Sequence, residues 1–481
     1  MTYNHMLFGC LVENVEIKVE KEKDRKTSLT WMLMLGLALF LFSFFAEAES
    51  VVSTAGTQFS EQGTVPAAST QEDWSIHGQL TTVAQWHPAF NAPYTGQNSL
   101  NPNSNSNETT DLTLYAGYRL SANDEIWANP EIDQGFGLSN TFGMAGYPSG
   151  EAYKVGANTP YLRLPRLFYR KTIELGDEKQ DIESAANQFG GTRLAENVVI
   201  TAGKFSVVDV FDTNSYAHDP RMDFMNWSLV DAGAFDYAAD AWGYTNGISA
   251  EWTQSWWTLR GGFFELSKIP NATKLDPTLN QYEVVTEWEE RHEFEGYPGK
   301  FKFLLFTNRG KMGSYADAIQ LAYQTNGVPD TALVRRYGWN TGFAINLEQQ
   351  LTSALGAFAR ISNNEGSKEA FEFTEINKSI SAGLSMDGRS LGRSADKLGA
   401  AVAVNGLSGA ARQYFSAGGM GILIGDGQIN YGLEKISEVY YSWSATRQIQ
   451  VSLDYQYVVN PAYNQDRGPV SIYGVRVHGE I

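Results

Sequence analysis

The stretch Gln448–Val459 reads QIQVSLDYQYVV, and apolar and polar residues alternate along it without a break. The apolar positions are Ile449, Val451, Leu453, Tyr455, Tyr457 and Val459, and the polar positions are Gln450, Ser452, Asp454 and Gln456. Successive side chains of a β-strand point to opposite faces of the sheet. The segment therefore predicts a strand with one face against an apolar environment and the other face in water.

The same alternation recurs from Trp74 to the end of the chain, in about sixteen segments. They run approximately over 74–86, 111–120, 125–134, 161–173, 198–204, 242–253, 256–265, 282–293, 299–307, 341–351, 355–363, 379–388, 398–405, 435–446, 449–459 and 470–480. No apolar run after Ala48 approaches the roughly twenty residues of a membrane helix. An even number of half-apolar strands is typical of bacterial transmembrane barrels. We therefore predict an all-β fold, a transmembrane antiparallel β-barrel of about sixteen strands.

The connections between these segments support the same prediction. Several are tight, as at Ser121–Asp124 and Thr352–Ala354, whereas most others are long. The long ones are 87–110, 135–160, 205–241, 266–281, 308–340 and 406–434. Outer-membrane barrels have long external loops and mostly short periplasmic turns. The connection 174–197 is too long for a simple turn, and we interpret it as an insertion.

Composition excludes several other classes of protein. The 481 residues carry a formal net charge of −18, which disfavours binding to nucleic acid. A mean hydropathy of −0.30 suits a barrel whose lumen is wet better than a bundle of membrane helices. The single cysteine, Cys10, provides no disulfide framework. Neither a Gly-x-Ser-x-Gly nor a His-Glu-x-x-His motif occurs, so we expect no enzyme activity and no cofactor.

The N-terminal part predicts export. Trp31–Phe45 is an apolar run preceded by Lys21, Lys23 and Arg25, and a small-x-small site ends at Ala48. We predict a signal peptide with a long N-region at 1–48, cleaved after Ala48 on the general secretory route. Residues 49–73 form a flexible periplasmic lead segment by composition, and residues 74–481 form the outer-membrane barrel.

Five passages resemble the carbohydrate-selective porins of Gram-negative bacteria. They are NPEIDQGFGLSNTFGMAGYPSGEAYKVG (129–156), PYLRLPRLFYR (160–170), GKFSVVDVFDTNSYAHDPRMDFMNW (203–227), DAGAFDYAADAWGY (231–244) and NPAYNQDRGPVSIYGVR (460–476). The resemblance implies a sixteen-stranded barrel in the outer membrane and passive diffusion that prefers sugars. It also implies that loops fold inward and narrow the channel.

Alternation predicts which side chains face the lumen. Pro165 cannot donate a ladder hydrogen bond and indicates a bulge, past which the inward phase slips by one residue. The candidate lumen residues are Trp127, Asn129, Glu131, Asp133, Arg163, Arg166, Arg170, Arg260, Glu287, Glu289, Arg291 and Lys302. Arginine donates through a planar fork and carboxylates accept, which suits the hydroxyls of a neutral sugar. The alternative is that these charges pair and only stiffen the wall.

The loop at 205–241 carries the remaining candidates. Its acidic and aromatic residues predict a constriction loop that contains Asp209, Asp212, His218, Asp219 and Arg221. An external lid is the alternative, because long loops serve both uses. Asp212, His218, Asp219 and Asp223 follow no standard metal-ligand spacing, so we expect no metal.

The function predicted from these observations is passive, carbohydrate-selective diffusion. The partners we expect are small neutral sugars and outer-membrane lipid, with the protein a monomer or a trimer. A general, non-selective porin that also passes ions and a secreted soluble sugar-binding β protein remain alternatives.

Overall fold

The structure is a computed structural model that describes residues 72–152 and 155–481. The signal peptide predicted at 1–48, its cleavage site and nearly all of the lead segment at 49–73 lie outside the described residues, so these three stay predictions.

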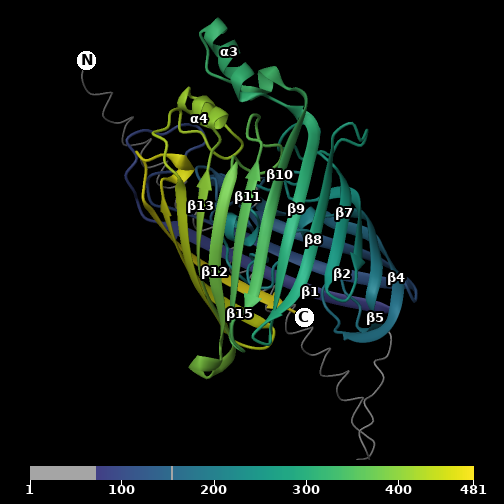
Figure 1. Cartoon of the computed structure of the whole chain (residues 1–481). Coiled ribbons are helices and arrows are strands. Elements are labelled where there is room, and N and C mark those ends of the chain that lie inside the picture. Colours follow the sequence, from purple (N-terminus) through teal and green to yellow (C-terminus); the bar gives the residue numbers. More distant parts are fainter. Residues whose placement is uncertain (1–71, 153–154) are drawn as a thin grey trace, which may run out of the picture. The chain divides into compact units, whose positions relative to one another are not determined.

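The described residues form one closed antiparallel sheet of sixteen strands (Figure 1). Each strand pairs with its neighbours in the chain, and β1 closes the barrel by pairing with β16. The strands are β1 Trp74–His87, β2 Asn105–Ser121, β3 Asp124–Gly135, β4 Ala157–Ile182, β5 Gly191–Phe205, β6 Thr245–Thr253, β7 Trp257–Glu265, β8 Tyr282–Phe294, β9 Tyr297–Met312, β10 Arg336–Gln350, β11 Leu355–Asn364, β12 Lys378–Gly388, β13 Arg393–Gly406, β14 Glu434–Ser444, β15 Ile449–Val459 and β16 Val470–Glu480. The predicted sixteen-stranded barrel is confirmed.

Helical segments are short and lie in the connections. They are η1 Leu138–Thr141, η2 Val207–Asp209, α2 Trp227–Val230, α3 Tyr315–Thr325, η3 Thr331–Val334, η4 Arg389–Leu391, α4 Gly409–Ser416 and η5 Pro461–Tyr463. None of the helices in the described ranges is long and apolar enough to cross a membrane.

The two faces of the sheet have the polarity that a membrane requires. In β15, Leu453 on the outer face is 61% exposed, whereas Gln456 on the inner face is fully buried. Leu112, Ile126 and Leu162 are likewise exposed on the outside of other strands. A protein in water would bury such residues, so the apolar exterior fits a lipid environment and the polar interior fits a lumen.

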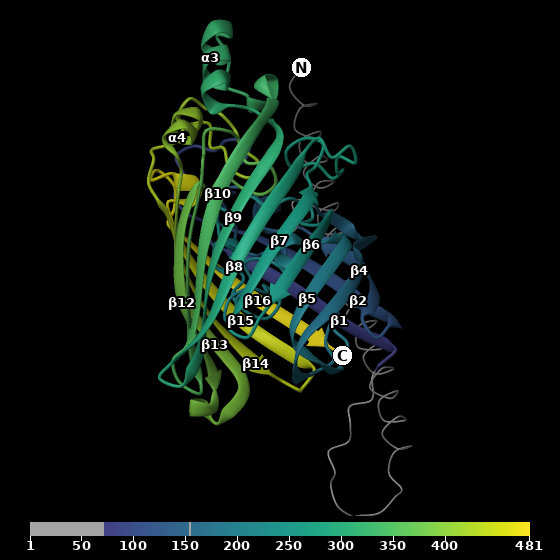
Figure 2. The same cartoon turned by 45° about the vertical axis from the view of Figure 1, so that its right-hand side comes forward.

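The connections gather at two ends of the barrel. At one end, the long-loop end, lie 88–104, 136–156, 206–244, 266–281, 313–335, 365–377, 407–433 and 460–469. At the other, the short-turn end, lie 122–123, 183–190, 254–256, 295–296, 351–354, 389–392 and 445–448. Figures 1 and 2 both show α3 and α4 at the long-loop end. The last residue, Ile481, exchanges backbone hydrogen bonds with Gly78 at the short-turn end.

The prediction that 174–197 is an inserted connection is wrong. β4 continues to Ile182 and β5 begins at Gly191, so most of this stretch is a paired hairpin. Its register is regular except for a shift between Leu175 and Lys179. The segment is rich in charged residues and both its faces are polar, so it lacks the alternation that marks a strand against lipid.

The loop 206–244 folds into the barrel and fills much of its interior. Phe211, Phe224, Asn226, Leu229 and Ala238 of this loop are each completely buried. The loop therefore lies inside the lumen and does not form an external lid.

Because every strand pairs on both sides, we expect the folded protein to resist SDS without heating and to migrate faster on a gel than the boiled chain. The substitution Val475→Pro removes a ladder donor from the middle of β16 and should lower the temperature of the mobility change by several degrees. Ser353→Pro, in a short turn, is the control and should leave it nearly unchanged. Equal mobility before and after boiling would contradict a closed barrel.

Candidate functional site

Inward-facing carboxyl groups of the barrel wall hold the loop 206–244 in place. Each accepts a hydrogen bond from one or two backbone N–H groups of the loop, at N···O distances of 2.5 to 3.0 Å. The pairs are Glu287 with Asp212, Glu348 with Ser215, Glu438 with Met225 and Asn226, and Glu283 with Ala238. Buried backbone donors without a partner are costly, so these wall residues stabilise the position of the loop.

Asp212 lies at the centre of this attachment. Its Oδ1 accepts from Arg360 Nε at 3.1 Å, and its Oδ2 accepts from the backbone N–H of Ala232 at 2.6 Å. Arg360 also donates to the carbonyl oxygens of Leu229 and Ala217, both at 2.8 Å. Asp212 was predicted as a constriction residue, and the structure places it in a fully buried contact between loop and wall.

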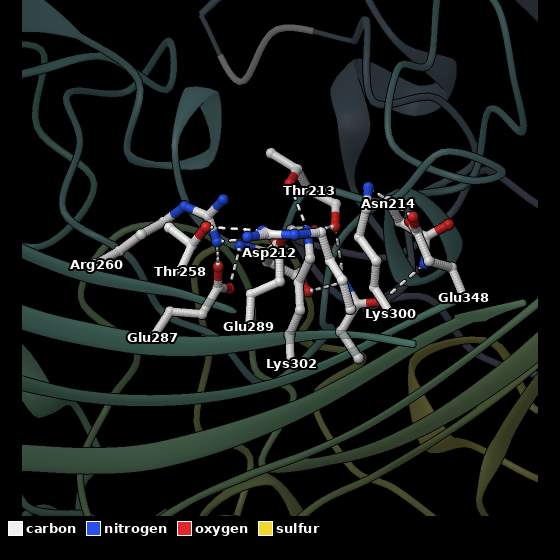
Figure 3. Close-up of polar contacts among 12 residues, drawn as sticks. Asp212, Thr213, Asn214, Thr258, Arg260, Glu287, Glu289, Lys300, Lys302 and Glu348 are labelled. Carbon is white, nitrogen blue, oxygen red and sulfur yellow. Dashed lines mark hydrogen bonds and ion pairs between the residues drawn. The ribbon is translucent and has the colours of Figure 1, made fainter. Parts of the chain in front are cut away.

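A charged network continues from this contact along the wall (Figure 3). Arg260 lies 2.9 Å from Glu251, 2.8 Å from Glu287 and 2.9 Å from Glu289. Lys302 donates to Thr213 Oγ1 at 2.6 Å and lies 3.5 Å from Glu289. These predicted lumen residues face inward, and their charges are paired with one another.

Arg163 belongs to a second inward cluster, on β3 and β4. Its guanidinium contacts the carboxylates of Glu131, at 2.6 Å, and Asp133. The centre of the guanidinium lies 5.2 Å from the Trp242 ring and 5.5 Å from the Tyr244 ring, both of which belong to the loop 206–244. The structure thus brings a paired arginine and carboxylate together with two aromatic faces.

Arg166 also faces inward because of a bulge in β4. Asn129 pairs with Arg166 and Glu131 pairs with Arg163, so the two residues 164 and 165 of β4 oppose a single residue of β3. This is the bulge predicted from Pro165. Arg166 forms a bidentate contact with Asp209, at 2.6 and 2.8 Å, and its guanidinium lies 5.0 Å from the Tyr244 ring.

Electrostatics keep the Arg166–Asp209 pair ionised. Burial raises the pKa of Asp209, but the Arg166 guanidinium outweighs burial and holds the pKa below its ordinary value. Burial lowers the pKa of the neighbouring His218, so this imidazole is neutral near pH 7. The pair therefore presents one fixed donor fork and one fixed acceptor across the lumen.

The loop residues Asp219 and Arg221 lie near the Arg163 cluster. Asp219 accepts from the backbone N–H of Arg221 at 2.9 Å. The Arg221 guanidinium lies 3.4 Å from Glu151, 3.5 Å from Asp111 and 3.7 Å from Glu131. Within the described parts of the chain, no group of His, Cys, Asp and Glu side chains has the arrangement of a metal site.

Of the remaining predicted lumen residues, one packs against an aromatic ring, two donate hydrogen bonds to backbone carbonyls, and one is buried without a polar partner in the described part of the chain. Trp127 is fully buried against Phe189, with ring centroids 4.8 Å apart. Arg170 donates to the Asn187 carbonyl at 2.7 Å. Asn129 is buried, and among the described residues its amide has no hydrogen-bond partner. Arg291 donates to the Gln254 and Trp257 carbonyls, at 2.5 and 2.9 Å, and so fastens a turn.

Two cavities lie in the barrel. The smaller, of about 80 Å³, is bounded by Glu131, Glu151, Arg163 and Arg221 and by loop aromatics. The larger, of about 850 Å³, reaches from Phe168 and Asp209 to the short-turn end. Along β4, Arg166 lies between Arg163 of the small cavity and Phe168 of the large one. Asp209, the partner of Arg166, itself belongs to the lining of the larger cavity.

Sequence reasoning missed the aromatic wall of the small cavity. Trp227 stacks with Tyr147 at 5.2 Å and with Phe373 at 4.9 Å, and these residues come from three different loops. Tyr237 packs against the same group. Alternation locates strand residues only, so no periodic signal marks these loop residues. Asp111 was also missed, although its place in a strand next to Leu112 put it on the inner face.

Comparisons with known proteins agree with this architecture. Residues 97–480 match the family model described as carbohydrate-selective porin, OprB family. The high-pH structure of Pseudomonas putida OprB aligns with a TM-score of 0.64 at 14% identity, covering 85% of this chain and 94% of that chain. The low-pH structure of the same protein gives 0.43 at 12% identity, covering 85% and 93%, and Acinetobacter baumannii OccAB1 gives 0.44 at 10%, covering 86% and 99%. No curated protein matches in sequence.

The loop attachment makes a testable prediction. Glu438→Ala leaves the buried N–H groups of Met225 and Asn226 without their acceptor, at a cost of about 1–3 kcal/mol each. We expect a more mobile loop, seen as larger current fluctuations and a higher mean conductance in a planar bilayer. Glu178→Ala removes an exposed carboxylate of the β4–β5 hairpin and should change neither. An unchanged current from Glu438→Ala would show that the wall carboxyls do not hold the loop.

Proposed function

The chain belongs to the carbohydrate-selective porin, OprB family, and from this membership we propose that it forms a passive pore for small neutral sugars in the Gram-negative outer membrane. The observation that carries the proposal is the cluster of Arg163, Glu131, Trp242 and Tyr244, which combines paired charges with aromatic faces in the lumen. Family and fold imply a channel and not an enzyme.

The cluster has the chemistry that a sugar requires. A sugar has hydroxyl groups that donate and accept hydrogen bonds, and ring faces that are weakly apolar. The guanidinium donates through several N–H groups, the carboxylate accepts, and an aromatic ring covers the sugar face. Because Arg163 is paired with Glu131 and Asp133, the cluster has no unpaired arginine charge that would draw anions. These features favour a neutral polyol over a simple ion.

The Arg166–Asp209 pair is the second element of the proposal. Arg166 lies along β4 between residues that line the small and the large cavity, and Asp209 lines the large one, which supports a place for this pair on the path of a solute. We assign the constriction to Arg166, Asp209 and Arg163, with Asp219 and Arg221 supporting the same region. Asp212 stays outside this assignment because its carboxyl oxygens are occupied by Arg360, Asn346 and Ala232.

The placement in the cell belongs to the same proposal. The exposed leucine and isoleucine side chains of the outer face support contact with outer-membrane lipid. The long-loop end faces the outside and the short-turn end faces the periplasm, because bacterial barrels place their short turns there. Export by the general secretory route rests on the predicted signal peptide. For the oligomeric state we keep the prediction of a monomer or a trimer.

The selectivity assignment is tested with Arg163→Ala and Arg166→Ala. Each change removes a charge-assisted hydrogen bond worth about 1.5–3 kcal/mol and frees a carboxylate. We expect affinity for glucose, measured as block of the ionic current, to fall by about tenfold to a hundredfold. The reversal potential in a salt gradient should move toward cation preference.

Arg389→Ala is the matched control, because this exposed arginine lies at the short-turn end and pairs with Asp387 outside the lumen. It should change neither the block by glucose nor the reversal potential. If the two lumen variants also change neither quantity, Arg163 and Arg166 only support the wall.

A further inference from the structure

The larger cavity lies at the short-turn end under the tip of the β4–β5 hairpin. Residues 186–193 of this hairpin line it, together with residues of the strands from β2 to β8. The tip turns inward, since Phe189 is buried against Trp127 and the Arg119 guanidinium lies 4.5 Å above its ring. The hairpin that breaks the pattern of short turns therefore builds one wall of this chamber.

The tip is fixed in this position by polar contacts. Glu72, just before β1, accepts hydrogen bonds from Ser184 Oγ and from the backbone N–H of Gly190, both at 3.0 Å. The Arg119 Nε donates to the carbonyl of Glu72 at 2.7 Å. The hairpin tip, Arg119 and the residue before β1 thus hold one another in place on one side of the chamber.

The lining of the chamber carries charges of both signs. Of the described residues that line it, five are arginines, namely Arg119, Arg170, Arg193, Arg260 and Arg291, and four are acids, namely Glu125, Glu174, Glu251 and Asp209. Most of the arginines are committed to partners. Arg260 pairs with carboxylates, Arg291 contacts Glu289 and carbonyl oxygens, and Arg119 and Arg170 donate to backbone carbonyls. Glu287 and Glu289, which contact Arg260 from beside the lining, offset the difference between the two counts.

Arg193 differs from the other arginines of the lining. It belongs to the part of β5 that extends into the hairpin, opposite Gln180. Within residues 72–152 and 155–481 it forms no hydrogen bond or ion pair, and its Nε is buried without an acceptor. A guanidinium offers five donors and keeps its charge at any physiological pH. The structure thus holds, in the wall of this chamber, an arginine whose buried Nε has no acceptor within the described ranges.

We propose that this chamber is a second ligand site, which takes a monosaccharide that carries one carboxylate. A carboxylate matches the planar fork of Arg193 in a bidentate contact and supplies the acceptor that its buried Nε lacks. Phe168 and Phe205 supply ring surface in the wall, and Asn197 and Thr201 supply polar groups for hydroxyls. This site goes beyond the neutral-sugar constriction and rests on the proposed pore function only for the route by which the ligand arrives.

The test compares galacturonate with galactose as blockers of the ionic current through the pore in a planar bilayer at moderate salt. We expect galacturonate to block at a concentration about tenfold or more below that of galactose. Arg193→Gln should weaken the block by galacturonate about tenfold and leave the block by galactose unchanged. Arg193→Lys keeps the positive charge but loses the planar pair of donors. Its block by galacturonate should therefore be weaker than that of the unmodified protein and stronger than that of Arg193→Gln.

The matched control is Arg447→Gln, which removes an exposed arginine from another turn of the same end. It should behave as the unmodified protein. Equal block by the two sugars, or full block by galacturonate in Arg193→Gln, would overturn the site. Tighter block by galactose 6-phosphate than by galacturonate would overturn the assignment to a carboxylate. Absence of any block by galactose would count against the neutral-sugar function alone. The block by galacturonate could still be compared between the unmodified protein and Arg193→Gln.

Discussion

A loop that enters a barrel brings backbone N–H groups into a space where no neighbouring strand can accept their hydrogen bonds. Leaving such donors buried and unpaired costs about 1–3 kcal/mol each. In this protein, acidic side chains supply the acceptors. Glu438 binds two consecutive N–H groups of the loop 206–244, and Asp236 of that loop binds two consecutive N–H groups, of Phe371 and Glu372. The arrangement of the interior depends on this one kind of hydrogen bond, from a backbone N–H group to a side-chain carboxyl oxygen, which recurs with different partners.

The same interaction joins several loops to one another. Glu434 of β14 accepts from Ala145 and Gly146 of the loop 136–156, at 3.1 and 2.7 Å, and from Ala462 of the loop 460–469, at 2.8 Å. Glu372 in turn accepts from the backbone N–H of Ser267. A carboxyl group suits this task because its two oxygens can serve adjacent donors at once. The acidic composition of the chain, with a net charge of −18, therefore has a structural use inside the barrel.

Inward carboxyl groups have two kinds of partner, and some, such as Glu287, have both. Those bound to loop backbones, such as Glu283 and Glu438, fix the shape of the lumen. Those bound to arginines, such as Glu131 and Asp209, line the two cavities. Asp212 belongs to the framework because Arg360, Asn346 and the backbone N–H of Ala232 occupy its carboxyl group, whereas Asp209, three residues earlier, pairs with Arg166 and lines the larger cavity.

The sequence predicts the barrel well because lipid imposes a strict rule on every second residue of a strand. That rule located all sixteen strands and, through Pro165, the bulge that turns both Arg163 and Arg166 inward. It fails where lipid is absent. The hairpin at 174–197 has polar residues on both faces and was interpreted as an insertion.

The path of the loop 206–244 is set by contacts such as Asp212–Arg360, which join residues far apart in sequence and leave no periodic pattern in the sequence. The meeting of Arg163 with Trp242 was unpredictable for the same reason.

The central claim is that paired charges and aromatic faces in the lumen favour neutral sugars over other solutes of similar size. Swelling of liposomes that contain the unmodified protein tests this claim most directly, with glucose compared against lysine and glutamate. Glucose should enter several times faster than either amino acid, because a charged solute must compete with the existing ion pairs. Equal rates of swelling for the three solutes would contradict the account and identify a general pore.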